Sequence, residues 1–136
     1  MLVVRIKLIK INTFSDKRGK LSIFQNNDYL DFKIKRFYYI YDLKKKISRG
    51  SHAHKKTTQI AICLKGQCEY LLDNGKKKKN IILSSNKKGL ILEKGTWHEL
   101  KNCSSDCIVL IIADKLYDRS DYIEDYEKFI KYTKKF

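Results

Sequence analysis

The chain has 136 residues, of which 43% are hydrophobic, and this fits one folded domain with a core of its own. The composition excludes a disordered chain, and no apolar run is long enough to cross a bilayer. The N-terminal segment has no signal-peptide pattern, so we expect a single domain over residues 1–136 in the cytoplasm.

Thirty basic residues stand against fifteen acidic ones, which gives a formal net charge of +15. Such an excess suggests an anionic partner: a nucleic acid, a membrane surface or a phosphorylated small molecule. Most of it is lysine in runs typical of solvated turns, as at residues 76–79. No nucleic-acid recognition motif accompanies the charge, so we expect no nucleic acid and no membrane as partner.

Short apolar or alternating runs with turn signals between them follow one another along the chain, which is typical of an all-β protein. The runs cover residues 2–11, 20–24, 35–43, 58–64, 67–72, 80–83, 89–92 and 107–113. Lys65-Gly66 predicts a tight turn, and Asp73-Asn74-Gly75 predicts a hairpin. So many short strands in a small chain predict a closed barrel or a sandwich.

The run at residues 35–43 alternates between two kinds of side chain. Arg36 and Tyr38 share one face of the expected strand, and Phe37, Tyr39 and Tyr41 share the other. Arginine and tyrosine in a barrel lumen would suit an anionic, hydroxylated ligand, and the tyrosines of the other face would be ordinary packing residues. The sequence leaves open which face points inward.

After residue 120 the pattern changes to that of an amphipathic helix. Four apolar side chains recur at helical spacing on one face: Tyr122, Tyr126, Phe129 and Ile130. Asp121 and Glu124 predict a capping box at its start. We expect a short C-terminal α-helix packed against the β domain.

The four cysteines lie in or beside apolar strand residues, and none forms a C-x-x-C pair (Cys63, Cys68, Cys103 and Cys107). This placement predicts reduced thiols packed in the core of a cytosolic protein. A zinc site built from all four thiolates is the alternative.

All three histidines lie in two motifs, R-G-S-H-A-H at residues 49–54 and G-T-W-H at residues 95–98. In an extended segment His52 and His54 point to the same face, because strand side chains alternate. His98 follows a glycine turn and can meet them from another strand. The three imidazoles therefore predict a metal or general-base site in the mouth of a small barrel.

The two motifs together resemble the signature of the cupin superfamily. The first reads Gly50, His52, His54, Gln59 and Gly66, and the second reads Gly95, His98 and Asn102 with Glu93 where proline is usual. Metal-binding cupins use three imidazoles and a carboxylate, whereas Gln59 is an uncharged amide that holds a divalent cation less well. We therefore expect no metal or other cofactor, and imidazoles that act as general acids or bases.

Longer segments are similar to the dTDP-4-keto-6-deoxy-D-glucose 3,4-ketoisomerases over residues 16–129. They are D-K-R-G (16–19), I-K-R-F-Y-Y-I (34–40), R-G-S-H-A-H-K (49–55), G-L (89–90), W-H-E (97–99) and Y-D-R-S-D-Y-I (117–123). The resemblance implies a cupin-like jelly-roll β-barrel, a metal-free enzyme and a homodimer with exchanged N-terminal strands. It also implies dTDP-4-keto-6-deoxyglucose as substrate, on a pathway to dTDP-3-amino-3,6-dideoxy sugars for surface polysaccharides.

The implied reaction moves a ketone from C4 to C3 of the sugar. A base removes the C3 proton, an enediol forms, and a proton returns to C4. His52 matches the family's catalytic base, and we expect His54 and Tyr38 to polarise or protonate the oxygens.

The arginines fit the nucleotide diphosphate of that substrate. Arg18 and Arg49 are expected to clamp the pyrophosphate with bidentate geometry that lysine does not offer. Arg36, Gln59 and His98 are expected to contact the substrate in the lumen. The pair Arg18-Gly19 looks more like the branch of the family that forms the galacto product.

Three alternatives remain open. A 3,5-epimerase on nucleotide sugars pairs a histidine base with an aspartate, and the sequence offers no aspartate suited to this role near the H-x-H motif. A metal-dependent cupin enzyme would need a bound ion. A non-catalytic module that binds sugar or nucleic acid is favoured only by the charge, with His52 and His54 as structural histidines.

Overall fold

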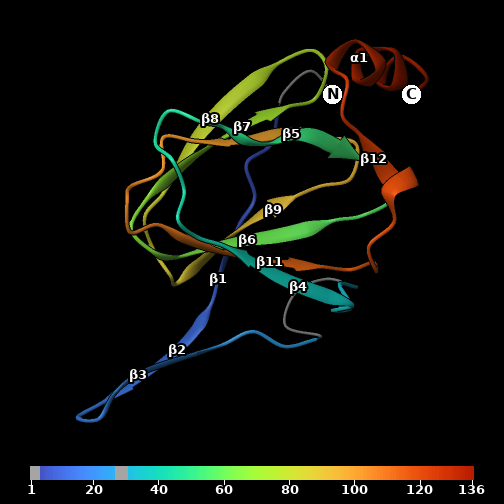
Figure 1. Cartoon of the computed structure of the whole chain (residues 1–136). Coiled ribbons are helices and arrows are strands. Elements are labelled where there is room, and N and C mark those ends of the chain that lie inside the picture. Colours follow the sequence, from blue (N-terminus) through green and yellow to red (C-terminus); the bar gives the residue numbers. More distant parts are fainter. Residues whose placement is uncertain (1–3, 27–30) are drawn as a thin grey trace.

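The computed structural model describes residues 4–26 and 31–136 and consists of two five-stranded antiparallel sheets with a projecting hairpin (Figure 1). In spatial order the first sheet contains β1 (Leu8–Lys10), β9 (Lys88–Leu92), β6 (Gln59–Lys65), β11 (Ile108–Ala113) and β4 (Arg36–Ile40). The second contains β12 (Tyr122–Ile123), β5 (Arg49–His54), β10 (Trp97–Lys101), β7 (Cys68–Asp73) and β8 (Lys78–Leu83). The hairpin pairs β2 (Asn12–Asp16) with β3 (Gly19–Ile23).

The all-β prediction is confirmed, and each predicted run coincides with a strand. The run at residues 2–11 is the poorest match, because only β1 is a strand there and residues 2 and 3 lie outside the described part of the chain. The strands β2 and β12 were not predicted. Those that carry the histidines, β5 and β10, were expected only as extended segments.

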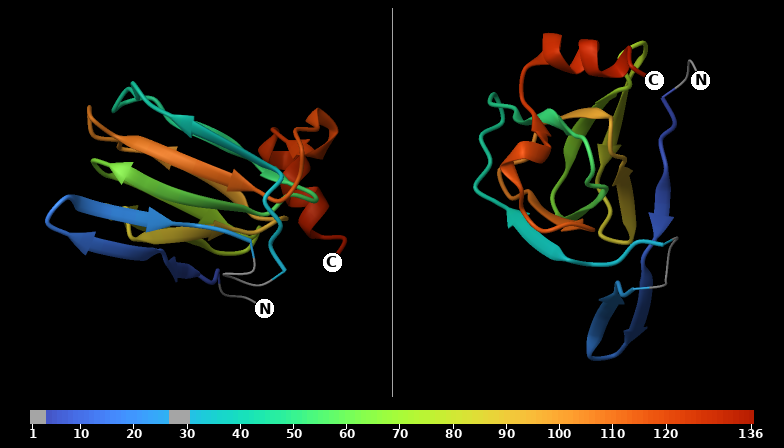
Figure 2. Two further views of the ribbon diagram at one scale, coloured as in Figure 1. Left: turned by 90° about the horizontal axis from the view of Figure 1, so that it is seen from below. Right: turned by 90° about the vertical axis from the view of Figure 1, so that its right-hand side faces the viewer.

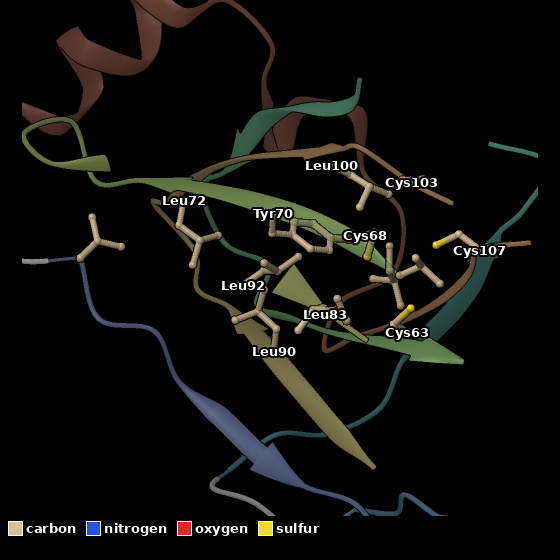
Figure 3. Close-up of a cluster of buried hydrophobic side chains, with 14 residues drawn as sticks. Cys63, Cys68, Tyr70, Leu72, Leu83, Leu90, Leu92, Leu100, Cys103 and Cys107 are labelled. Carbon is tan, nitrogen blue, oxygen red and sulfur yellow. The ribbon is translucent and has the colours of Figure 1, made fainter. Parts of the chain in front are cut away.

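The main core lies between the two sheets and draws side chains from both (Figure 3). Tyr70 and Leu72 of β7 meet Leu90 and Leu92 of β9, and each is at most 2% exposed. The first sheet also buries its outer face under a second apolar cluster, so that residues 59–63 of β6 are all buried. No strand pairing joins the two sheets within residues 4–26 and 31–136, so the arrangement is a jelly-roll sandwich and the predicted closed barrel is only loosely correct.

The two predicted turns are present. Gly66 joins β6 to β7 with φ of +73°, and Gly75 lies in the turn between β7 and β8 with φ of +89°. At Gly66 a Cβ atom would lie 2.2 Å from the side-chain oxygen of Ser104 and 3.0 Å from Cα of Cys107. Both the backbone conformation and the close packing therefore require glycine at this turn.

The C-terminal helix exists, but its start was wrongly predicted. α1 spans Tyr126–Thr133 and is capped by Asp125, whose carboxylate accepts from the backbone N of Lys128 at 2.9 Å. Asp121 belongs to the 3₁₀ turn Arg119–Asp121, and Tyr122 belongs to β12. Pairing of β12 with β5 overrides the helical pattern at these positions.

The open question about β4 is answered by its burial pattern. Arg36 and Tyr38 point toward the interior, whereas Phe37 is 65% exposed and Tyr39 59% exposed. Tyr41, beyond the strand, stacks on Tyr39 with 5.7 Å between ring centroids and is itself 57% exposed. In the single chain these tyrosines are exposed to solvent, so the expectation that they are ordinary packing residues is wrong there.

The hairpin of β2 and β3 extends away from the two sheets, as the right-hand view of Figure 2 shows. It carries apolar side chains in solvent: Phe14 is 62% exposed, Leu21 57% and Ile23 38%.

In the part of the chain that is described, no helix is long and apolar enough to span a membrane.

The four cysteines are free and buried, as predicted. The sulfur atoms of Cys63, Cys68 and Cys107 lie within 4.8 Å of one another at one end of the core (Figure 3). Sγ of Cys63 lies within hydrogen-bond distance of the carbonyl oxygens of Lys65 at 3.3 Å and Gly66 at 3.4 Å. The hydrogen bond from Cys68 lowers the pKa of Cys63 to about 7.

Candidate active site

The histidines are brought together by the pairing of β5 with β10, in which His52 lies opposite His98. The register shifts between His98 and Leu100, and Gly50 takes up the irregularity with φ of +84°. A Cβ atom on Gly50 would make an ordinary contact with the ring of His98 at 3.5 Å, so it is the positive φ that favours glycine here. The glycine of the first motif therefore shapes the strand that presents the histidines.

The three imidazoles form one compact cluster, as the motifs predicted. Nε2 of His52 lies 3.2 Å from Nε2 of His54. The ring centroids of His52 and His98 are 4.7 Å apart. Each residue offers a ring nitrogen within 4.8 Å of the others, so the cluster is also compact enough for the metal-dependent alternative.

Asp121 is the residue that sequence reasoning missed. Its carboxylate accepts from Nδ1 of His54 at 2.9 Å, from Oγ1 of Thr57 at 2.6 Å and from the backbone N of Lys56 at 2.6 Å. The statement that no aspartate lies near the H-x-H motif is therefore wrong, because β12 pairs with β5 and places Asp121 beside His54. The Y-D-R-S-D-Y-I segment was the available signal.

Tyr122 was also missed, since it was expected on a helix. Its ring centroid lies 4.4 Å from that of His54 and 4.9 Å from that of His52. It follows Asp121 directly, so the junction of the 3₁₀ turn and β12 supplies both a carboxylate and an aromatic wall to the histidine cluster.

The first sheet contributes the opposite wall, and it carries three of the predicted residues. Nε2 of the fully buried Gln59 donates to the hydroxyl of Tyr38 at 3.0 Å. The guanidinium of Arg36 lies 5.3 Å from the centroid of the Tyr38 ring. Oε1 of Gln59 and Nε of Arg36 are buried without a hydrogen-bond partner among the residues described, so both are available to a polar ligand.

The pKa shifts follow from burial and from neighbouring charges. Burial, with the neighbouring His54 second, lowers the pKa of His52 to about 4. Burial also lowers the pKa of His54, and it lowers that of His98 further. For Tyr38, burial raises the pKa. At neutral pH the imidazoles are therefore uncharged proton acceptors and Tyr38 is a proton donor.

The two remaining arginines differ in position. Arg49 is the exposed first residue of β5, and its charge acts to lower the pKa of Tyr38, which places it near the site. Arg18 lies in the turn of the projecting hairpin, where its side chain is 85% exposed and bound to Asp16. Within one chain Arg18 does not join the histidine cluster, so its predicted role is not met by this chain alone.

Comparison with known proteins agrees with this geometry. The family described as "FdtA: WxcM-like, C-terminal" matches residues 4–134. A TDP-4-oxo-6-deoxy-alpha-D-glucose-3,4-oxoisomerase from Aneurinibacillus thermoaerophilus is 42% identical over 95% of this chain and 93% of its own length. A mutant of the 3,4-ketoisomerase QdtA from Thermoanaerobacterium thermosaccharolyticum, in complex with TDP-4-keto-6-deoxyglucose, has a TM-score of 0.93 and 34% identity over 98% of this chain and 96% of its own.

A dTDP-4-dehydrorhamnose 3,5-epimerase from Bacillus anthracis shares the fold at a TM-score of 0.75, with 20% identity over 86% of this chain and 76% of its own. At that identity the likeness extends to the fold alone. The sequence match over almost the whole chain, together with the histidine cluster between the sheets, assigns the protein to the dTDP-4-keto-6-deoxy-D-glucose 3,4-ketoisomerase family.

Proposed function

We propose that this protein moves the keto group of dTDP-4-keto-6-deoxy-D-glucose from C4 to C3 and forms a dTDP-3-keto-6-deoxyhexose. The observation that carries the proposal is the cluster of three uncharged imidazoles facing Tyr38 and Arg36 across the interior. The named activity of the Aneurinibacillus relative and the ligand of the QdtA complex support this substrate.

His52 is the base, because it is the one histidine of the cluster that is not fully buried. It takes the C3 proton, which the adjacent carbonyl acidifies, and the electron pair passes into the enediol. The same imidazolium returns a proton to C4. Tyr38 exchanges protons with the two sugar oxygens, and its raised pKa keeps its hydroxyl protonated for this step. Both ring nitrogens of His54 are engaged, by Asp121 and by His52, so the expected proton exchange between His54 and a sugar oxygen does not fit this arrangement.

The substrate is held by the wall that faces the histidines. Arg36 and Gln59 each present a buried polar atom without a partner among the described residues, and His98 lies beside His52. Arg49 binds the pyrophosphate, and its exposed position at the start of β5 supports this role.

Arg18 completes the site only in a homodimer with exchanged N-terminal strands. The hairpin that carries Arg18 projects from the two sheets (Figure 1). Its side chains of Phe14 and Leu21 are exposed to solvent. The edge strand β4 presents Phe37 and Tyr39 in solvent as well. Apolar surface of this kind favours association, and an exchanged hairpin would bring Arg18 to the pyrophosphate of the partner's substrate.

The finer parts of the proposal rest on the family resemblance. The pair Arg18-Gly19 favours the galacto configuration at C4 of the product. A 3-keto product is the substrate that an aminotransferase needs on the way to dTDP-3-amino-3,6-dideoxy sugars. The cytoplasmic location stays a prediction from the sequence.

Incubation with the 4-keto sugar in D₂O tests the activity. A 3,4-ketoisomerase exchanges hydrogen at C3 and C4 and yields a C3 ketone, which NMR identifies together with the C4 configuration. Deuterium at C5 would identify the 3,5-epimerase, which the position of Asp121 beside His54 makes a specific rival. If no deuterium enters the sugar at any carbon, the protein is a non-catalytic module that binds the sugar.

Variants of the base give the second test. His52→Asn should lower kcat by roughly 10²- to 10⁴-fold while leaving dTDP binding intact. Lys76→Asn, in an exposed turn, is the matched control, because it also introduces an asparagine but should leave kcat unchanged. If the His52 variant keeps full turnover, the base assignment is wrong, and activity that requires stoichiometric metal would identify the metal-dependent alternative.

A further inference from the structure

We propose that Asp121 is a positioning residue that fixes the tautomer of His54 and, through it, the proton on His52. The proposal rests on the proposed function, since it concerns the same site. The carboxylate of Asp121 makes its hydrogen bonds with His54, Thr57 and Lys56, so its control of the proton on His52 passes through His54.

The carboxylate of Asp121 is held rigidly from several sides. It is 5% exposed, Oδ1 accepts from the backbone N of Lys56, and Oδ2 accepts from Thr57 and His54. The backbone carbonyl of Asp121 also accepts from the N of Lys55 at 2.9 Å. Burial alone would raise the pKa of Asp121, but the hydrogen bonds from Thr57, His54 and Lys56 outweigh it and the pKa is lowered. The carboxylate is thus ionised and can only accept hydrogen bonds.

The protonation pattern of the histidines follows from this anchor. A neutral imidazole carries one N–H, and facing an ionised acceptor this proton must lie on Nδ1 of His54. Nε2 of His54 is then a bare acceptor. Nε2 of His52, 3.2 Å away, must therefore be the donor, which leaves the lone pair of His52 on Nδ1.

The chain of hydrogen bonds thus runs in one direction, from His52 through His54 to Asp121. When His52 takes a proton, its imidazolium donates to Nε2 of His54, and the negative charge of Asp121 stabilises the positive charge through the intervening ring. The same direction keeps the lone pair of His52 on one defined nitrogen before the reaction begins.

Asp121→Asn separates this role from a merely structural one. Oδ1 must still accept from the backbone N of Lys56, so the amide nitrogen would face His54 and donate to Nδ1. His54 would then carry its proton on Nε2, and the chain of hydrogen bonds would reverse. Thr57→Val is the matched control, because it removes a neighbouring hydroxyl donor to Oδ2 and leaves the carboxylate ionised.

Two-bond ¹⁵N–¹H correlation spectra of the full-length protein with ¹⁵N-labelled histidine, recorded without substrate at neutral pH, read the tautomers directly. The wild type and Thr57→Val should show His54 protonated on Nδ1, and Asp121→Asn should show it protonated on Nε2. A wild-type His54 protonated on Nε2 overturns the proposal, and so does an unchanged tautomer in a folded Asp121→Asn variant. The wild-type spectrum is decisive by itself if that variant fails to fold.

Kinetics on the same proteins connect the tautomer to turnover. Asp121→Asn should lower kcat on the order of 10²- to 10⁴-fold with a much smaller change in KM, as expected for a histidine held in the wrong tautomer. Unchanged kcat in a variant with a reversed tautomer overturns the catalytic consequence. If the tautomers are as stated but the wild type does not isomerise the sugar, the proposed function fails and the assignment of Asp121 stands.

Discussion

Acidification should weaken the fold through its buried histidines, and His52 provides the measurable case. Its pKa is lowered from 6.5 to about 4 in the folded protein, mainly by burial. Between pH 6.5 and about pH 4, His52 is protonated in the unfolded chain but not in the folded protein. The stability due to the neutral ring is therefore complete above pH 6.5 and is lost as the pH falls toward 4.

The size of the effect follows from the two pKa values. At pH 5 the contribution of His52 amounts to a loss of about 2 kcal/mol of unfolding free energy. The pKa values of His54 and His98 are lowered too, so their contributions have the same sign. Asp121 does not oppose the loss in this window, because its pKa is lowered and its contribution disappears only below its ordinary value of 3.8.

Urea unfolding at pH 7.5 and pH 5.0, at one protein concentration, measures the loss. His52→Asn removes one titrating group, so its unfolding free energy should fall by about 2 kcal/mol less than that of the wild type over this interval. The control Lys76→Asn should behave like the wild type. Equal losses in the wild type and His52→Asn would show that His52 is not buried in neutral form.

Further outcomes concern the core, the thiols and the site. Phe129→Ala, at a fully buried position that anchors α1, should cost about 3–5 kcal/mol in urea unfolding, whereas Phe136→Ala, 90% exposed, should change it by less than about 0.5 kcal/mol. The four cysteines should react with a thiol reagent only after denaturation, and stoichiometric zinc in the purified protein would contradict packed thiols. Tyr38→Phe should lower kcat by roughly 10²-fold or more, and it should cost about 1–3 kcal/mol of unfolding free energy because the buried amide of Gln59 loses its acceptor. Retained turnover would remove Tyr38 from the proton exchange.

The strands whose side chains alternate or are continuously apolar were predictable, because burial imposes those patterns locally. The run at residues 58–64 predicted β6, and R-G-S-H-A-H predicted two imidazoles on one face. The helix start was not predictable in this way. Asp121, Tyr122 and Glu124 fit a helical pattern as well as Asp125 and Tyr126 do, and only the pairing of β12 with β5 decides between them.

Some features of the candidate site could likewise be predicted from the sequence, and others depend on strand pairing. The residue types and their spacing determined an all-β fold, a convergence of His52, His54 and His98, and the family to which the chain belongs. Tertiary structure alone decided that Arg36 and Tyr38 face inward, that Asp121 anchors His54, and that Arg18 stands apart from the histidines of its own chain. The physical reason is that periodicity reports which side chains are buried, whereas a hydrogen bond between residues 54 and 121 depends on strand pairing far apart in sequence.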